Sequence, residues 1–325
     1  MSAEEIRRFL RPGMEKVEAL IRESLATDIG LLDATNMKLR EHPGKMMRPA
    51  LAILSAEACG GVNEDTIRFA AASELLHNAT LLHDDVVDGA TERRGMPTVA
   101  TLLSSPAAVL IGDFWLTRCM QAILDASRFS ERVLRVFAAT LSNLAEGELL
   151  QMEKSSMADT TQKDYLRIIY CKTASLFEAS AEAAAISVEA APEHLEAVKS
   201  YARKLGIAFQ IKDDILDYLP SPGALGKPVG LDLKEQKITQ PLLCAFESVP
   251  GMESSVREMV SHLADDSAMA DKVRRFVTEN GGTQKAGEVM DSYICGAVES
   301  LSALPASKAK EALAELASYV AKRDR

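Results

Sequence analysis

Apolar residues recur at intervals of three and four along most of the chain. The stretches AVLIGDFWLTRCMQAIL and VLRVFAATLSNLAEGELLQM follow this pattern, which is typical of amphipathic helices. Proline is absent between Pro106 and Pro192 and between Pro250 and Pro305, so long helices can continue there without a break. Alternating strand patterns bounded by Asn-Gly or Asp-Gly turns are not found. The sequence therefore predicts an all-α protein with roughly ten or more helices and essentially no sheet.

The same pattern favours a single helical domain over residues 1–325. A chain of 325 residues could form one large domain or two. No low-complexity linker or internal repeat divides it, and its one Pro- and Gly-rich interruption, PSPGALGKPVG, is predicted to be a loop within the domain. The hydrophobic fraction of 47% is ample for one core.

Charge and cysteine content narrow the class of protein. A formal net charge of -10 disfavours a nucleic-acid partner. The five cysteines are scattered and never in CxxC spacing, so we expect neither disulfides nor a zinc site, in keeping with a reducing cytoplasm. The N-terminal stretch MSAEEIRRFL has no apolar signal core, and no uncharged stretch is long enough to span a bilayer. We expect a soluble cytoplasmic protein without a transmembrane segment.

Three aspartates close one of the predicted helices. The segment SELLHNATLLHDDVVD is expected to end near Gly89, and it carries Asp84, Asp85 and Asp88 in its last turn. Carboxylates there repel one another and meet the negative end of the helix dipole. A solvated acidic surface is the ordinary explanation for clustered charge, but the apolar residues before and within the cluster argue against it.

A second aspartate cluster with the same spacing indicates that the first one has a function. The stretch GIAFQIKDDILDY carries Asp213, Asp214 and Asp217 in the same i, i+1, i+4 spacing after another apolar helix. Oxygen ligands grouped in this way suit Mg²⁺, which commonly takes one or two carboxylates and binds substrate phosphates. Histidines and thiolates are not arranged for a softer metal.

Basic residues accompany both clusters. Taken singly, each is more often a surface charge than a ligand, but together with six carboxylates they describe a site for two polyphosphate groups. These residues are Lys45, Arg48, Arg93, Arg94, Lys172, Lys227, Lys234 and Lys237.

These motifs resemble those of the trans-isoprenyl diphosphate synthases, the prenyltransferases that elongate an allylic diphosphate with isopentenyl diphosphate. The matching stretches run in the family's order from Gly44 to Pro241. They are GKMMRP, ELLHNATLLHDDVVDGATERRG, GDFWLTR, GELLQ, KTASLFE, FQIKDDILDY and GKPVGLDLKEQKITQP.

The resemblance implies the all-α isoprenoid synthase fold, a bundle around a central cavity, and a role for each matching residue. Three Mg²⁺ ions would bind Asp84, Asp85, Asp88, Asp213, Asp214 and Asp217. The allylic diphosphate would also contact Arg93, Lys172, Lys227 and Lys237. Isopentenyl diphosphate would bind Lys45, Arg48, His77 and Arg94, and Thr173 and Gln210 would sit beside the reacting carbons. Homodimers are usual in the family, and PAAVLIGDFWLTRCMQAIL is either an interface helix or internal core.

The implied chemistry begins with ionisation of the allylic C–O bond, because divalent ions and cations neutralise the leaving diphosphate. Isopentenyl diphosphate then attacks the allylic cation, and the departing diphosphate takes the proton. Apolar walls matter because water reaching the cation would quench it.

Product length is expected to depend on the residues one turn before Asp84. Short-chain members of the family carry bulky aromatic residues there, whereas this chain has Ala79 and Thr80. We therefore expect a long product, between C30 and C50, with the tunnel floor formed deeper by large residues such as Trp115 or Phe137.

The chain departs from the family pattern at two positions, with Gln236 in place of a frequent Gly and Ala100 in place of a frequent Asn. Neither carries a charge that the mechanism needs, but the loop near Lys237 could differ in fine geometry.

The alternative functions are a short-chain synthase, a class I terpene cyclase and a non-catalytic partner subunit of a heteromeric synthase. The second metal motif of a class I terpene cyclase differs from FQIKDDILDY.

Overall fold

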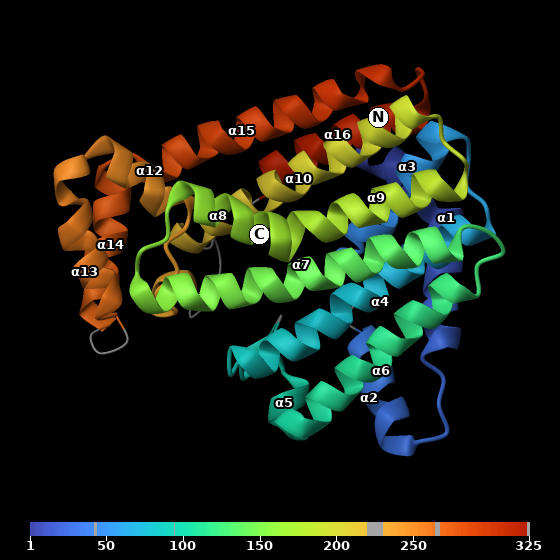
Figure 1. Ribbon diagram of the computed structural model, residues 1–325, viewed down its shortest axis with the longest axis horizontal. Coiled ribbons are helices and arrows are strands. Elements are labelled where there is room, and N and C mark those ends of the chain that lie inside the picture. Colours follow the sequence, from blue (N-terminus) through green and yellow to red (C-terminus); the bar gives the residue numbers. More distant parts are fainter. Residues whose placement is uncertain (42–43, 94, 220–229, 264–266, 324–325) are drawn as a thin grey trace. The chain divides into compact units, whose positions relative to one another are not determined.

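The structure, a computed structural model, describes residues 1–41, 44–93, 95–219, 230–263 and 267–323. Helices α1 to α16 make up most of this part of the chain (Figure 1), so the predicted all-α class is confirmed. The only strands within the described residues are the short β1 (Glu92–Arg93) and β2 (Met96–Pro97), which pair antiparallel.

Contacts within the chain define two compact units. Unit 1 consists of residues 1–138, 179–199 and 303–313, and unit 2 of residues 139–178, 200–302 and 314–325. Several long helices contribute residues to both units: α7 (Ser130–Met157), α9 (Ser175–Ser187), α10 (Pro192–Tyr218) and α16 (Lys308–Lys322). The assignment of the whole chain to a single domain stays a prediction.

Unit 1 is organised around α4, the helix that carries the first aspartate cluster. It contains α1 (Ala3–Ser24), α2 (Gly30–Glu41), α3 (Met47–Cys59), α4 (Glu64–Val87), α5 (Val99–Leu102) and α6 (Ser105–Leu124). Asn63 caps α4, since its side chain accepts a hydrogen bond from the Thr66 N–H at 2.9 Å. Helix α4 packs against α6, α3 and α1, and its Phe69 and Leu75 are fully buried. This packing fixes the helix that ends in Asp84, Asp85 and Asp88.

Helix α6 bears on the expectation that the chain has no transmembrane segment. Among the described helices it is the one that is long and apolar enough, by length and composition alone, to cross a membrane. It also carries Asp113 and Arg118, and its Trp115 is buried and donates a hydrogen bond to the Asn36 side chain at 2.9 Å. These features are equally those of a helix that packs inside a folded domain.

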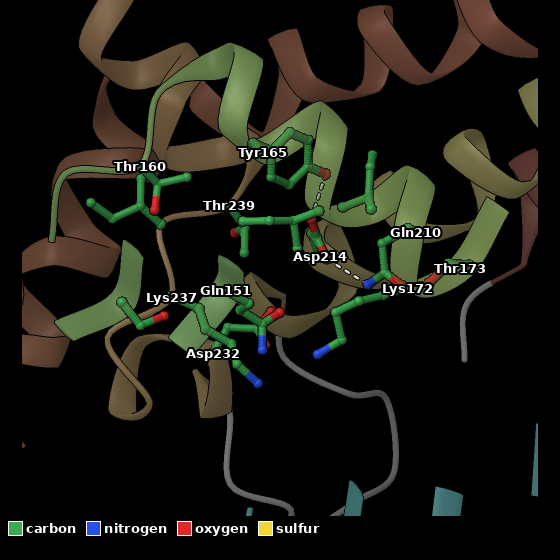
Figure 2. A pocket seen from close by; sticks show the side chains of 14 residues that line it. Gln151, Thr160, Tyr165, Lys172, Thr173, Gln210, Asp214, Asp232, Lys237 and Thr239 are labelled. Carbon is green, nitrogen blue, oxygen red and sulfur yellow. Dashed lines mark hydrogen bonds between the residues drawn. The ribbon is translucent and has the colours of Figure 1, made fainter. Parts of the chain in front are cut away.

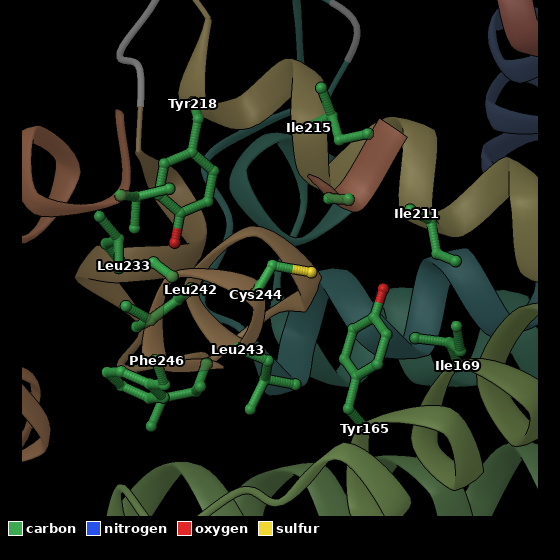
Figure 3. Packing of buried hydrophobic residues seen from close by; sticks show 14 of the residues in the cluster. Tyr165, Ile169, Ile211, Ile215, Tyr218, Leu233, Leu242, Leu243, Cys244 and Phe246 are labelled. Atoms are coloured by element: carbon green, nitrogen blue, oxygen red, sulfur yellow. The ribbon is translucent and has the colours of Figure 1, made fainter. Parts of the chain in front are cut away.

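Unit 2 has its own apolar core. Besides parts of the shared helices it contains α8 (Gln162–Ile169), a π-helical turn η1 (Tyr170–Ala174), α11 (Leu231–Lys234), α12 (Gln240–Ser248), η2 (Pro250–Met252), α13 (Glu253–Ser261), α14 (Ser267–Glu279), α15 (Gly282–Ser300) and η3 (Leu301–Ala303). Figure 3 shows how residues of α8, α10 and α12, among them Ile169, Ile215 and Leu242, gather in this core. Tyr165 also lies in this core, and its hydroxyl contacts the second aspartate cluster.

Candidate active site

The first aspartate cluster ends α4 as the sequence predicts. The helix finishes at Val87, and Gly89 adopts the left-handed conformation, with φ +61°. The Gly89 N–H donates to the Val86 carbonyl and the Ala90 N–H to the Asp85 carbonyl, which is the hydrogen-bond pattern of a Schellman motif. This cap places the three carboxylates at the very end of the helix.

The three carboxylates differ in environment. Asp85 is buried, and its Oδ1 accepts a hydrogen bond from Arg93 Nε at 2.6 Å. Asp84 is half-buried and Asp88 is exposed, and the two lie on the same face of the helix end. Asp84 and Asp88 are therefore the more accessible to a cation from solvent, whereas Asp85 holds Arg93.

The residues expected to bind isopentenyl diphosphate lie on three segments of unit 1. Lys45 is exposed in the approach to α3, Arg48 is half-buried in the first turn of α3, and His77 is half-buried on α4, two turns before Asp84. Arg94, the fourth of this set, lies outside the described residues.

The second aspartate cluster closes α10 in unit 2. Asp213 is half-exposed, and its Oδ1 lies 2.8 Å from Nη2 of Arg323. Asp217 accepts a hydrogen bond from the Asp232 N–H at 3.1 Å, at the start of α11. Asp214 is buried and lines a pocket of about 150 Å³ together with Lys172, Lys237 and other residues (Figure 2).

Asp214 belongs to a chain of hydrogen bonds. Its carboxylate accepts one from the Tyr165 hydroxyl at 2.6 Å and one from Gln210 Nε2 at 2.9 Å, and Gln210 Oε1 accepts one from Thr173 Oγ1 at 2.7 Å. Burial raises the pKa of Asp214 to about 7, opposed by these two donors and increased by the charges of Asp213 and Asp217. Asp214 thus orients Gln210 and Thr173 from a buried position.

Lys172 and Thr173 lie on the π-helical turn η1, and such turns are frequent at functional sites. Two helices approach the turn closely at glycines. A Cβ built on Gly147 of α7 would lie 2.6 Å from the Cβ of Cys171, and one on Gly206 of α10 would lie 2.6 Å from the Cα of Ala174. Because these two glycines have no side chain, α7 and α10 can lie against the turn that contributes to the pocket.

The basic residues of unit 2 have carboxylate partners. Lys172 pairs with Glu148, and Lys237 pairs with Glu235. The Lys237 N–H also donates to the Asp232 carbonyl at 2.8 Å. Lys227, in the loop stretch PSPGALGKPVG, lies outside the described residues, which omit residues 220–229.

Three residues at this site were not predicted from the sequence. Asp232 lines the pocket, and desolvation, followed by the charges of Asp214 and Asp217, raises its pKa well above the usual range. Asp232 could have been predicted from the sequence, because it lies within the matching stretch GLDLKEQK. Tyr165 and Arg323 lie outside every matching stretch, so only the fold brings them to the aspartates.

The donor set suits a magnesium site that is completed by substrate. Among the described residues, no three His, Cys, Asp or Glu side chains converge as a ready-made metal cage. Mg²⁺ is usually held by one or two carboxylates plus phosphate oxygens and water, so the accessible carboxylates at the end of α4 and at the end of α10 each fit it.

The residues expected to control product length are placed in unit 1. Ala79 is 1% exposed, whereas Thr80 is half-buried and its hydroxyl donates to the His77 carbonyl at 2.9 Å. Trp115 and Phe137 are both buried. A separate apolar cavity of about 370 Å³ lies on the neighbouring face of α4, lined by residues that include Asn78, Leu81, Leu82 and Asp85. Ala79 and Thr80 do not line that cavity.

An all-helical fold with two helix-ending aspartate clusters and cations near them defines a class of diphosphate-handling enzymes. The polyprenyl synthetase family model matches residues 30–279, and the chain belongs to this family. Octaprenyl diphosphate synthase of Haemophilus influenzae is 37% identical over 318 residues, 98% of this chain and 96% of the relative. A short chain isoprenyl diphosphate synthase of Methanothermobacter thermautotrophicus is 35% identical, over 98% of this chain and 99% of the relative.

The fold agrees with a solved structure in the same family. The polyprenyl synthase from Caulobacter crescentus, complexed with calcium and isoprenyl diphosphate, matches with a TM-score of 0.92 and 33% identity. The match covers 100% of this chain and 98% of that chain.

Proposed function

We propose that the protein is a trans-prenyltransferase that elongates an allylic diphosphate with isopentenyl diphosphate to a long-chain all-trans polyprenyl diphosphate. The observation that carries the proposal is the pocket at the second aspartate cluster. It brings two lysines, several hydroxyls, two amides and two carboxylates together beside apolar residues, in a chain that belongs to the polyprenyl synthetase family. A leaving diphosphate and a growing hydrocarbon need this combination.

The two aspartate clusters would hold Mg²⁺, three ions by analogy with the family. Bound Mg²⁺ would neutralise the diphosphate as the allylic C–O bond ionises. We assign direct ligation to the more accessible Asp84 and Asp88 in the first cluster and Asp213 and Asp217 in the second. The buried Asp85 and Asp214 orient their neighbours.

The basic residues complete diphosphate binding. Lys172 and Lys237 reach the pocket from separate elements (Figure 2), and both can exchange a glutamate partner for a phosphate oxygen. Arg93, paired with Asp85, is the matching cation of the first cluster. Lys227 is assigned to the same diphosphate, and Lys45, Arg48, His77 and Arg94 to isopentenyl diphosphate.

The reacting carbons need a dry surface next to these charges. Ile168, Ile169 and Ile238 line the same pocket as Thr173 and Gln210. These apolar walls limit the access of water to the allylic cation, and the hydrogen-bonded Thr173 and Gln210 turn neutral dipoles, not charges, toward it.

Product analysis tests the proposal. The purified protein alone, given isopentenyl diphosphate, an allylic primer and Mg²⁺, should form linear prenyl diphosphates of C30 to C50 by mass. A cyclic hydrocarbon would instead indicate a terpene cyclase, and absence of product a partner subunit. A product of C20 or shorter would retain the prenyltransferase and overturn the long-chain assignment.

We also propose that the protein works as a homodimer in the cytoplasm. The apolar side chains of α6 are partly exposed, with Leu110 at 68% and Leu124 at 55%. These residues lie on one face of the helix and could pack against a second copy. All five cysteines are free thiols in the structure, which suits a reducing compartment.

A further inference from the structure

Arg323, which is distant in sequence, contacts the turn of α10 that carries Asp213. Arg323 follows α16, and its side chain is 3% exposed. Its Nη2 lies 2.8 Å from Asp213 Oδ1 and donates to the Phe209 carbonyl at 2.7 Å. Its guanidinium carbon lies 3.8 Å from the centroid of the Phe209 ring. Phe209 and Asp213 are one helical turn apart, so all three contacts fall on one turn.

These contacts fix the guanidinium in place. The ring restricts its plane, and the carbonyl and carboxylate restrict its rotation within that plane. Arg323 Nε is buried and has no hydrogen-bond partner within the described residues. A buried guanidinium with an unsatisfied donor is costly, and an apolar side chain of similar size could pack there at lower cost.

The arginine beside the first aspartate cluster behaves differently. The Arg93 side chain is 37% exposed and its partner Asp85 is 6% exposed, so the cation is the accessible member of that pair. In the second cluster the order is reversed, because Arg323 is 3% exposed and Asp213 is 41% exposed. Arg93 has room to turn toward a diphosphate, whereas Arg323 stays in place and leaves the carboxylate as the accessible group.

Charge gives Arg323 a further effect. Asp213 directly precedes the buried Asp214 and lies one turn before Asp217, so three carboxylates share the end of α10. Like charges this close repel one another and favour side-chain orientations that point apart. The fixed guanidinium opposes this change at Asp213.

We infer that Arg323 is a positioning residue, which fixes the orientation of the Asp213 carboxylate before a divalent cation binds there. The inference rests on the proposed function, in which Asp213 is a metal ligand. Arg323 itself would contact neither metal nor substrate. Partners that orient metal ligands typically change metal affinity or activity by about 10- to 100-fold when they are removed.

The test measures metal binding directly. Mn²⁺ binding in the presence of inorganic diphosphate is followed by electron paramagnetic resonance, and the Mg²⁺ dependence of turnover is measured in parallel. Arg323→Met should raise the Mn²⁺ dissociation constant and the half-maximal Mg²⁺ concentration by about 10- to 100-fold, with turnover recovering at high Mg²⁺. Lys322→Met is the matched control, because it removes the same charge from an exposed neighbouring position and should change neither value.

Arg323→Lys separates charge from geometry. Lysine can pair with Asp213, but it lacks the planar group that stacks on Phe209 while bonding its carbonyl. We expect metal affinity between those of the wild type and Arg323→Met. If Arg323→Met does not fold, Arg323→Lys still tests the inference.

Asp213→Asn distinguishes failure of this inference from failure of the proposed function. If Asp213→Asn leaves Mn²⁺ binding unchanged, Asp213 is not a ligand and the proposed site is wrong. If Asp213→Asn weakens binding and Arg323→Met only lowers the melting temperature, Arg323 merely anchors α16 and the inference alone is overturned. The double variant should bind Mn²⁺ no more weakly than Asp213→Asn, since the arginine acts through that carboxylate, and additive losses would also overturn the inference.

Discussion

Gln236 holds a backbone conformation that glycine adopts most readily. Its φ is +57°, and its side chain compensates in part by donating a hydrogen bond to the Ser261 carbonyl at 2.8 Å. The left-handed conformation costs a residue with a side chain about 1–2 kcal/mol. This conformation, next to Lys237, suits the Gly that the family pattern would place here, and the hydrogen bond helps the chain to accommodate glutamine.

Two substitutions at Gln236 should separate strain from hydrogen bonding. Gln236→Gly relieves the strain but loses the hydrogen bond and adds chain entropy to the unfolded state, so its stability should stay within about 1 kcal/mol of the wild type. Gln236→Ala loses the hydrogen bond without relief and should be about 1 kcal/mol less stable than either. Urea unfolding measures the order. An alanine variant as stable as the glycine variant would contradict the explanation.

Cys59, the last residue of α3, should react slowly with alkylating reagents. Burial raises the pKa of its thiol to about 11, so at pH 8 only about one molecule in a thousand carries the reactive thiolate. Alkylation by iodoacetamide in the folded protein should therefore increase about tenfold per pH unit up to about pH 11. Peptide mass spectrometry measures the rate, with the exposed Cys295 as the fast-reacting reference. Equal labelling of the two at pH 8 would contradict this expectation.

At the scale of elements, the site depends on how closely α10 approaches the turn η1. Gly206→Ala would place a Cβ against the backbone of Ala174, and the helix or the turn must shift. We expect a loss of about 1–3 kcal/mol in unfolding free energy, with reduced turnover because Lys172 and Thr173 move with the turn. Gly287→Ala in α15 is the control, since its Cβ meets nothing within 4 Å and should be neutral or stabilising by up to about 1 kcal/mol. A fully active Gly206→Ala enzyme would show that the close approach does not position the site.

Helix α4 offers a test of product length. A phenyl ring at the buried Ala79 would have to displace the core, whereas the half-buried Thr80 leaves more room. Thr80→Phe should therefore shorten the products toward C15 or C20 while the primer is still consumed. Thr80→Val, which replaces the hydroxyl bonded to the His77 carbonyl with a methyl group of similar size, should keep the long product. Product masses decide, and an unchanged long product from Thr80→Phe would refute the role of this position.

At the scale of the whole molecule, the exposed apolar face of α6 predicts the oligomeric state. If this face pairs two copies, a carboxylate in place of Leu110 would be buried without a partner and should weaken the dimer by more than about a hundredfold. Leu31→Glu on α2 is the matched control, because Leu31 is 61% exposed, close to the 68% of Leu110. Sedimentation velocity measures both variants. A monomeric wild-type protein would refute the dimer.

Local sequence patterns were enough to predict the helical class and the helices that carry the aspartates. Helical periodicity is local, so it predicts that residues at i, i+1 and i+4 gather at one helix end, and Gly89 marks that end through its left-handed conformation. The residue types in these positions were enough to predict the family, because the carboxylates, lysines and arginines follow one another in an order that resembles the family's. None of this needed contacts between distant segments.

Tertiary packing alone distinguishes the aspartates within each cluster. Within each cluster it is the second aspartate, Asp85 or Asp214, that is buried and hydrogen-bonded, and a repeated spacing cannot reveal this. Tyr165 reaches Asp214 from 49 residues away, and Arg323 reaches the helix turn of Phe209 from 114 residues away. Burial and pairing depend on which distant segments pack against a helix face, and a local pattern specifies the face but not its neighbour.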